Sequence, residues 1–304
     1  MHLTLRQLLI FAAVAETGST TAASARVALS QSATSAALNE LEKVLGARLF
    51  DRVGKRLIIN DNGRTLLPQA RAALDVASDI ESEFSVGTRN PRSANPPINL
   101  RIAASTTIGN YVLPSLITRF RREFPHARFE VQINNTRHAS AAVSRFEVDM
   151  GLIEGPSYEP DVHMELWVED ELAVLCSPEH PLALDNQRVK LKALREASWL
   201  LREAGSGTRE AVEQALRPHL FQLREDIQVG STEAIKHLVA EGLGVTCLSL
   251  KAVRDAITLG KLKVLDTTLP RLVRPLYLIH HRHKQISAGL ARFMDHCRNA
   301  AGSV

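Results

Sequence analysis

The sequence predicts an α/β protein in which a small helical module is joined by a long helix to a larger domain of two lobes. Three observations lead to this fold class. Two short alanine-rich segments, separated by a break, lie between residues 20 and 50. Small and apolar residues then recur at heptad spacing, and short apolar runs alternate with helical segments after residue 98. Such alternation is typical of a parallel sheet covered by helices.

Length and composition describe a folded globular chain. The 304 residues suffice for two or three domains, and 45% hydrophobic with 23% charged residues excludes a disordered or collagen-like chain. No apolar run reaches the roughly 18 residues of a membrane span, and no secretory signal begins the chain, so we expect a cytoplasmic protein without a membrane partner. Cys176, Cys247 and Cys297 lack C-x-x-C spacing and are expected to be reduced structural thiols.

Residues 1–60 predict a helix-turn-helix. Apolar residues from Leu5 onward recur at steps of three and four, and this first helix ends near Gly18. A second helix begins at Ser19 or Thr20, and Ser30 is placed to cap a third that ends at Gly46. The break between Ala28 and Ser30 is the turn, after which polar side chains are offered to base edges in the major groove.

The same module is basic and ends in a hairpin. It carries seven basic against four acidic residues, a net charge of +3 within a chain whose total is +4. Residues 57–59 read as a strand and residues 53–55 as a hairpin tip, which together form a wing suited to phosphates or a minor groove. The candidate DNA-contacting residues are Thr21, Gln31, Ser32, Thr34, Ser35, Asn39, Arg52, Lys55 and Arg56.

Residues 61–86 predict a linker helix with a dimerisation seam. The predicted seam residues are Leu66, Ala70, Ala73, Ala77, Ile80 and Phe84. Their heptad spacing favours a two-stranded helix pair, although Pro68 should bend the first turns and the small alanines could instead dock against the module's own body. Residues 87–97 contain three prolines and read as a hinge.

Residues 98–304 predict an effector-binding domain of two lobes. The first set of strands and helices gives lobe I over 98–164, and the second gives lobe II over 165–268. The last strand and the C-terminal helix, 269–304, return to lobe I. Two crossovers leave a cleft between the lobes.

Helix starts from both lobes converge on this cleft. One follows the strand "LRIAA" and the other lies in "GSGTR", so hydroxyls and backbone N–H groups can form two facing anion cradles. The candidate effector residues are Ser105, Thr106, Thr107, Glu154, Ser206, Gly207, Thr208 and Thr232. Glu154 would repel an anion unless the ligand carried a proton, and the alternative interpretation is that the hydroxyls only cap helices. We expect a small oxyanion, with a carboxylate metabolite as the second candidate.

Catalytic and metal motifs do not support other functions. The chain has no G-x-S-x-G, P-loop or H-E-x-x-H sequence, so we expect no enzyme and no cofactor. His280 and His281 alternate across a strand end and cannot face one metal ion together. A solute-binding protein or metabolic enzyme within residues 98–304 is the rival class, and the helix-turn-helix argues against it.

The run from "LRQLLIFAAVAETGS" through "FDRVGKRLIIN" resembles the winged helix-turn-helix of LysR-type transcriptional regulators. The resemblance extends over essentially the whole chain, and "REAGSGTRE" is similar to the YeiE-like branch, whose members are associated with sulfite. It carries Gln31, Ser32, Ser35 and Arg52 over as DNA contacts. The chain departs from many members at Ala36, where an arginine is frequent, so different operator bases are expected.

The resemblance also implies an architecture and a set of partners. The effector domain is expected to have the periplasmic-binding-protein type of fold, and the linker helix to pair subunits. We therefore expect a homodimer or homotetramer bound to double-stranded operator DNA, with RNA polymerase as a candidate partner and a small oxyanion such as sulfite as effector.

Overall fold

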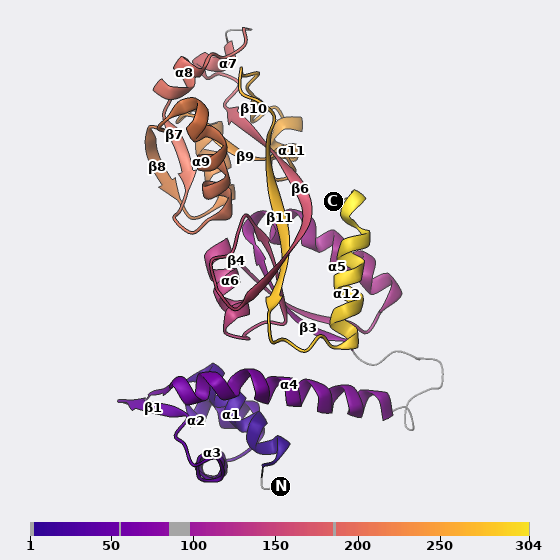
Figure 1. The fold of residues 1–304 in the computed structure, drawn as a ribbon. Helices are drawn as coiled ribbons and strands as arrows, with labels where there is room; N and C mark the ends of the chain where they lie inside the picture. The colour runs from indigo at the N-terminus through magenta and orange to yellow at the C-terminus, as the bar shows by residue number, and fades with distance from the viewer. Residues whose placement is uncertain (1–2, 55, 85–97, 185–186, 304) are drawn as a thin grey trace.

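The computed structural model describes residues 3–54, 56–84, 98–184 and 187–303 (Figure 1). It begins with three helices, α1 (Leu5–Thr17), α2 (Thr20–Arg26) and α3 (Gln31–Leu45). Thr4 and Gln7 form a capping box at the start of α1, and the Ser30 side chain accepts a hydrogen bond from the N–H of Ala33 at the start of α3. Ala28 adopts φ +52° in the turn between α2 and α3, so the predicted break is a left-handed residue.

A two-stranded wing follows the helices. β1 (Phe50–Val53) pairs antiparallel with β2 (Arg56–Ile59), and Val53 lies opposite Arg56 at the tip. Phe50 belongs to the module's core, where its ring lies 5.6 Å from that of Phe11. The wing is thereby fixed to the three helices.

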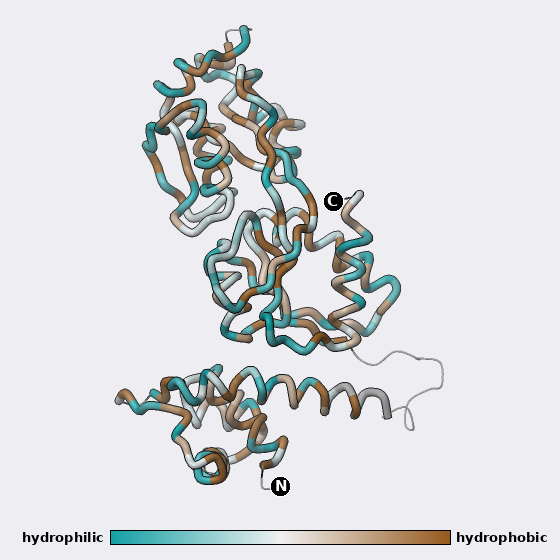
Figure 2. Tube along the Cα trace, in the orientation of Figure 1, coloured by the Kyte–Doolittle hydropathy of each residue, from teal (hydrophilic) through white to brown (hydrophobic). Residues whose placement is uncertain are grey.

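The linker helix α4 (Asp61–Phe84) is continuous and contains Pro68. Figure 2 shows hydrophobic and hydrophilic stretches alternating along it. Leu66, Ala70 and Ala73 pack into the module's own core, and Ala70 is only 1% exposed. Their assignment to an open dimerisation seam is therefore corrected, because α4 crosses α1 closely and uses the small alanines there.

Farther along α4, Val76 and Ile80 expose apolar side chains, and Ile80 is the more exposed of the two, at 52%. Phe84, Lys55 and the predicted hinge are outside the part of the chain whose side chains the structure describes.

A seven-stranded mixed sheet runs through both lobes. Its strands are β3 (Asn99–Ser105), β4 (Arg128–Asn134), β5 (Met150–Glu154), β6 (Val162–Cys176), β9 (Thr246–Ser249), β10 (Lys263–Val264) and β11 (Leu272–His281). The order is β10-β6-β11-β5-β3-β4, with β9 also paired to β6. β3 is parallel to β4 and β5, whereas β11 is antiparallel to β5 and β6. Within this sheet, the expected parallel pairing occurs only in lobe I.

Helices cover both lobes. Lobe I has the π-helix η2 (Ile108–Val112), α5 (Leu113–Glu123), α6 (Thr136–Ser144), α12 (Ala288–Asn299) and the short η3 (Ala301–Ser303). Lobe II has α7 (Pro181–Leu184), α8 (Leu191–Glu196), α9 (Gly207–Leu220), α10 (Thr232–Ala240), α11 (Leu250–Thr258) and a parallel strand pair, β7 (Trp199–Arg202) with β8 (Glu225–Val229).

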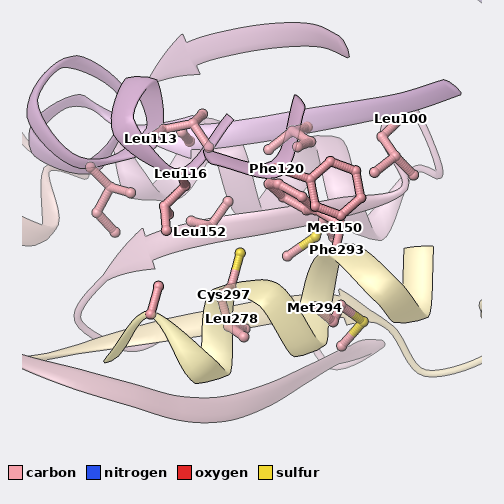
Figure 3. Close-up of a cluster of buried hydrophobic side chains, with 14 of the residues drawn as sticks. Leu100, Leu113, Leu116, Phe120, Met150, Leu152, Leu278, Phe293, Met294 and Cys297 are labelled. Atoms are coloured by element: carbon pink, nitrogen blue, oxygen red, sulfur yellow. The ribbon is translucent and has the colours of Figure 1, made fainter. Parts of the chain in front are cut away.

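The core of lobe I lies between α5, α12 and the sheet (Figure 3). Phe120 of α5 and Phe293 of α12 meet edge to face with ring centroids 5.1 Å apart. The indole N–H of Trp167 donates to the carbonyl of Cys297 at 2.8 Å. The return of the C-terminal helix to lobe I is explained by this packing.

The two lobes meet along β6 and β11, which are long enough to serve both cores. Trp167 and Leu276 pack in lobe I, whereas Leu172 on β6 and Leu272 on β11 pack in lobe II. The predicted lobe limits at 164/165 and 268/269 fall before these crossing points, because each strand continues from one lobe to the other without a break.

Candidate functional site

The polar N-terminal half of α3 forms the exposed surface of the helix-turn-helix. Gln31, Ser32 and Asn39 are exposed, and Ser35 is half-buried. The Gln31 amide donates to the Thr20 hydroxyl at 3.2 Å, which joins the starts of α2 and α3. The neighbouring Thr21 is also exposed. These side chains are accessible to a ligand as large as DNA.

Thr34 is an exception among the predicted DNA-contacting residues. It is fully buried, and its hydroxyl donates to the carbonyl of Ser30 at 3.0 Å. Thr34 shares the inner face of α3 with Leu38 and Leu41 at helical spacing, so it packs inward and cannot reach a base. Its assignment to the DNA surface is therefore wrong.

A groove of about 720 Å³ lies between the C-terminal half of α3 and the wing. It is lined by Ser35, Asn39 and Arg52 from the predicted set, and by the cations Lys43 and Arg48, which the predicted set omitted. Glu42 also lines it, but its carboxylate accepts from the N–H of Leu49 at 2.8 Å. Three cations outnumber this one carboxylate, so the net charge of the groove is positive, as phosphate binding requires.

In the effector domain, four of the predicted residues form one buried network. The Glu154 carboxylate accepts hydrogen bonds from Ser105 Oγ at 2.9 Å, Thr107 N at 2.7 Å and Thr208 Oγ1 at 2.6 Å. The predicted cradles therefore hold a carboxylate of the chain itself. Ser105, Thr107, Thr208 and Glu154 are corrected from ligand contacts to a network that joins the lobes, because helix-start donors bind an internal carboxylate as readily as a ligand.

Arg274 completes this network at the crossing of the lobes. Its Nη1 lies 2.7 Å from Glu154 Oε2 and its Nε 2.9 Å from Asp170 Oδ2, with all three side chains buried. Burial would raise the pKa of Glu154, but the Arg274 charge and the hydroxyl and N–H donors outweigh it and lower that pKa to about 2. Glu154 is therefore ionised at neutral pH.

The residues at the start of α9 are placed by the same network. Gly207 packs so closely that a Cβ there would lie 1.8 Å from the carbonyl oxygen of Glu154. The Ser206 side chain accepts from the N–H of Arg209 as the helix cap. Ser206 therefore caps a helix, which was the alternative to ligand binding for these hydroxyls.

The last two predicted effector residues are Thr106 and Thr232. Both contact a buried arginine that was not among the predicted residues. Arg202, 2% exposed at the end of β7, donates from Nη1 to Thr232 Oγ1 at 2.7 Å and from Nη2 to Thr106 Oγ1 at 3.2 Å. Thr106 belongs to lobe I, whereas Arg202 and Thr232 belong to lobe II. The only sequence signal was an arginine directly after the apolar strand "WLL", shortly before "GSGTR".

One carboxylate holds this arginine, and a second follows its hydroxyl partner Thr232 in the sequence. Glu203 accepts from Arg202 Nε at 2.8 Å and Nη2 at 3.0 Å, and also from Asn135 of lobe I at 3.0 Å. Glu233, the residue after Thr232, is paired with Lys236 at 2.9 Å and accepts from the hydroxyl of Tyr111 in lobe I. A cation with hydroxyl donors, bordered by side chains from both lobes, can bind a small anion.

The thiols and histidines offer no second chemistry in the described regions. Burial raises the pKa of Cys176 to about 11 and those of Cys247 and Cys297 to about 12, which disfavours thiolates. No cluster of three or more metal-ligating side chains occurs among residues 3–54, 56–84, 98–184 and 187–303. Within the same ranges, no helix is both long and apolar enough to cross a membrane.

A helix-turn-helix with a basic groove, carried on the same chain as a two-lobed α/β domain, defines a ligand-responsive DNA-binding regulator. Comparison with known families supports this class in both parts of the chain. Residues 5–64 match the bacterial regulatory helix-turn-helix of the lysR family, and residues 96–302 match the LysR substrate binding domain. The chain belongs to the LysR family of transcriptional regulators, and it is not an enzyme.

Comparison with individual proteins gives the same family. The chain is 48% identical to the transcriptional regulator YeiE of Escherichia coli K12 over 98% of each chain, which makes it a YeiE-like regulator. It is 30% identical to the transcriptional activator CmpR of Synechocystis over 96% of this chain and 94% of that one. A full-length OxyR variant of Pseudomonas aeruginosa, with one cysteine replaced by aspartate, is 25% identical with a TM-score of 0.77, covering 99% of this chain and 95% of that chain.

Proposed function

We propose that the protein regulates transcription in response to a small oxyanion that binds between the lobes at Arg202, and that sulfite is this effector. The buried guanidinium of Arg202 is the observation that carries the proposal. Its Nη atoms reach hydroxyls of both lobes, Thr106 and Thr232, so an anion bound there would touch both lobes at once. An effector acts by preferring one arrangement of the lobes, and contacts to both supply that preference.

The site favours a compact anion. Glu203 already holds one edge of the Arg202 guanidinium, and its charge would repel a second acidic group on the ligand. A small carboxylate is the second candidate, because a guanidinium binds carboxylates as well. Related domains bind different effectors: the regulatory domain of CcmR from Synechocystis, 28% identical with a TM-score of 0.61, was solved with 2-PG.

Calorimetry on the full chain tests the effector. Sulfite should bind the wild type, and Arg202→Met should abolish binding because the variant lacks the guanidinium that holds the anion. Arg188→Met is the matched control, since Arg188 is an exposed arginine of lobe II paired with Asp266. Acetate and malate, titrated in the same way, test the carboxylate. Sulfite binding that survives Arg202→Met would exclude this site.

The DNA-binding part of the proposal uses a homodimer or homotetramer. Paired modules would place Gln31, Ser32 and Ser35 of each subunit in successive major grooves, with Arg52 on the flanking backbone. We place the protein with its operator DNA in the cytoplasm, where RNA polymerase is available as a partner. Footprinting of the gene's upstream region with and without sulfite should show one protected site whose pattern changes with sulfite.

A further inference from the structure

We infer that Glu203 is an internal competitor for the effector, which holds the Arg202 guanidinium until an oxyanion displaces it. This inference rests on the proposed function. Its basis is that the cation proposed to bind the effector already carries a bidentate carboxylate, with Nε–Oε2 at 2.8 Å and Nη2–Oε1 at 3.0 Å. An oxyanion bound on this same Nε–Nη2 edge, next to the Thr106 hydroxyl on Nη2, must displace Glu203, because one guanidinium edge holds one carboxylate or one oxyanion in this geometry.

The acidic residues that follow Arg202 and Thr232 in the sequence differ in what holds them. Glu203 is bound to Arg202 itself, whereas Glu233 is paired with Lys236 and accepts a hydrogen bond from the hydroxyl of Tyr111. Glu203 is also less buried than its partner, with 22% of its side chain exposed against 2% for Arg202. Displacement can therefore move Glu203 into solvent while the arginine stays in place.

Displacement of Glu203 would also change a contact between the lobes. Asn135, which begins α6 in lobe I, donates its amide to Glu203 Oε1 at 3.0 Å. The side-chain oxygen Oδ1 of Asn135 accepts a hydrogen bond from the N–H of His138 and so caps the helix. Loss of the Arg202–Glu203 pair thus frees a lobe I side chain, which links anion binding to the arrangement of the lobes.

Competition lowers the apparent affinity of the wild type. A ligand whose site is competent only part of the time binds more weakly by that fraction. Glu203→Gln keeps the shape of the side chain but removes its charge, so it should bind Arg202 more weakly and compete less. We expect sulfite to bind Glu203→Gln about tenfold more tightly than wild type, because the neutral amide holds the guanidinium less strongly than the carboxylate and does not repel the anion.

Two matched variants separate competition from general electrostatics. Glu233→Gln removes the charge on the residue after Thr232, which is paired with Lys236 and not with Arg202, so it should change the sulfite affinity by much less. Asn135→Ser keeps an oxygen that caps α6 but loses the amide donor to Glu203, so it should tighten sulfite binding by a smaller factor than Glu203→Gln.

Calorimetry with sulfite and thermal melting on the full chain provide the readouts. Without sulfite Glu203→Gln should melt below wild type, because Arg202 is left buried with a weaker partner, and sulfite should raise its melting temperature more. If sulfite binds wild type but binds Glu203→Gln no more tightly, the inference that Glu203 competes with the effector is wrong. The same holds if Glu233→Gln increases the sulfite affinity as much as Glu203→Gln does. Absence of sulfite binding to both wild type and Glu203→Gln would instead overturn the proposed oxyanion effector, and with it this inference.

Discussion

Gly207 shows how a single residue fixes the relation of the lobes. A Cβ at this position would approach the carbonyl oxygen of Glu154 to 1.8 Å and Thr136 Oγ1 to 2.5 Å. Gly207→Ala should therefore lower the free energy of unfolding by about 2 kcal/mol or more, although alanine is the better helix former. Urea unfolding measures the effect. Gly230→Ala is the control, because nothing lies within 4 Å of its Cβ position, and an equal loss there would contradict the steric argument.

The buried Glu154 predicts how stability depends on pH. Its pKa in the folded protein is about 2, below the ordinary 4.5, so its contribution to stability is complete above pH 4.5. That contribution is lost as the pH falls from 4.5 toward 2, because the unfolded chain then binds the proton more readily. Glu154→Gln should destabilise the protein at pH 7 by about 3 kcal/mol, the order expected for breaking a buried pair. Chemical unfolding between pH 3 and 7 should show a shallower slope for the variant, and parallel curves would contradict this assignment.

At the residue scale, the sequence located the right segments but assigned them the wrong partner. Hydroxyls and N–H groups at the helix starts do converge from both lobes, as predicted. The carboxylate that they bind is Glu154, which lies 49 residues from Ser105 and 54 from Thr208, and helix-start chemistry does not distinguish it from a ligand. Arg202 was overlooked because an arginine at the end of a strand is usually exposed, and only the packing of both lobes shows it to be buried.

The recognition helix α3 permits a test at the scale of an element. Gln31→Ala should lose about 1 to 3 kcal/mol of preference for the operator, since an amide can bind a base edge through two hydrogen bonds. Arg52→Gln should weaken binding to operator and random DNA alike and flatten the salt dependence, because the proposed partner of Arg52 is a phosphate. Binding titrations at several salt concentrations distinguish them. If Gln31→Ala lost equal affinity for operator and random DNA, the Gln31 side chain would not recognise bases.

Introducing a negative charge should have different effects in the two halves of α4. Ala70 is packed in the module's core, whereas Ile80 is 52% exposed. Ala70→Glu should unfold the module, and circular dichroism would show lost helix. Ile80→Glu should leave the fold intact but break the subunit pair, because it places like charges in the proposed seam. An unchanged mass by light scattering would assign the interface elsewhere.

Elements with a clear periodic pattern of apolar residues were predicted well from the sequence, and elements without such a pattern were not. The three helices of the module begin and end close to the predicted residues, because Ser30, Gly18 and Gly46 are strong start and stop signals. A helix start was expected after the strand "LRIAA", but the π-helical geometry of η2 was not, since five residues are too few to show which helical period they follow. The first half of β6 was also not anticipated, because its exposed face carries charges that resemble a loop.

At the scale of the whole molecule, an ionic network joins the DNA-binding module to lobe I. Glu16 of α1 pairs with Arg71 of α4 at 2.7 Å and lies 3.6 Å from Arg101 of β3. Lys284, after β11, pairs with Asp75 of α4 at 2.6 Å and Asp149 of lobe I at 3.0 Å. Individual exposed ion pairs contribute little, but Arg71 and Lys284 are 5% and 6% exposed, so solvent screens them weakly.

Lys284→Met tests whether this network transmits the effector signal. The change leaves Asp75 and Asp149 without their shared cation, so α4 should separate from lobe I, and amide hydrogen exchange in α4 should become faster. The sulfite affinity of the cleft should persist, because Arg202 lies in the other lobe. The effect of sulfite on operator affinity should shrink severalfold, on the scale of a coupling free energy of about 1 to 3 kcal/mol. Lys192→Met is the control, since Lys192 is an exposed lysine of lobe II that lies 3.9 Å from Glu196. If Lys284→Met and Lys192→Met both kept the full sulfite response, the ion pairs of Lys284 would play no part in transmitting the signal.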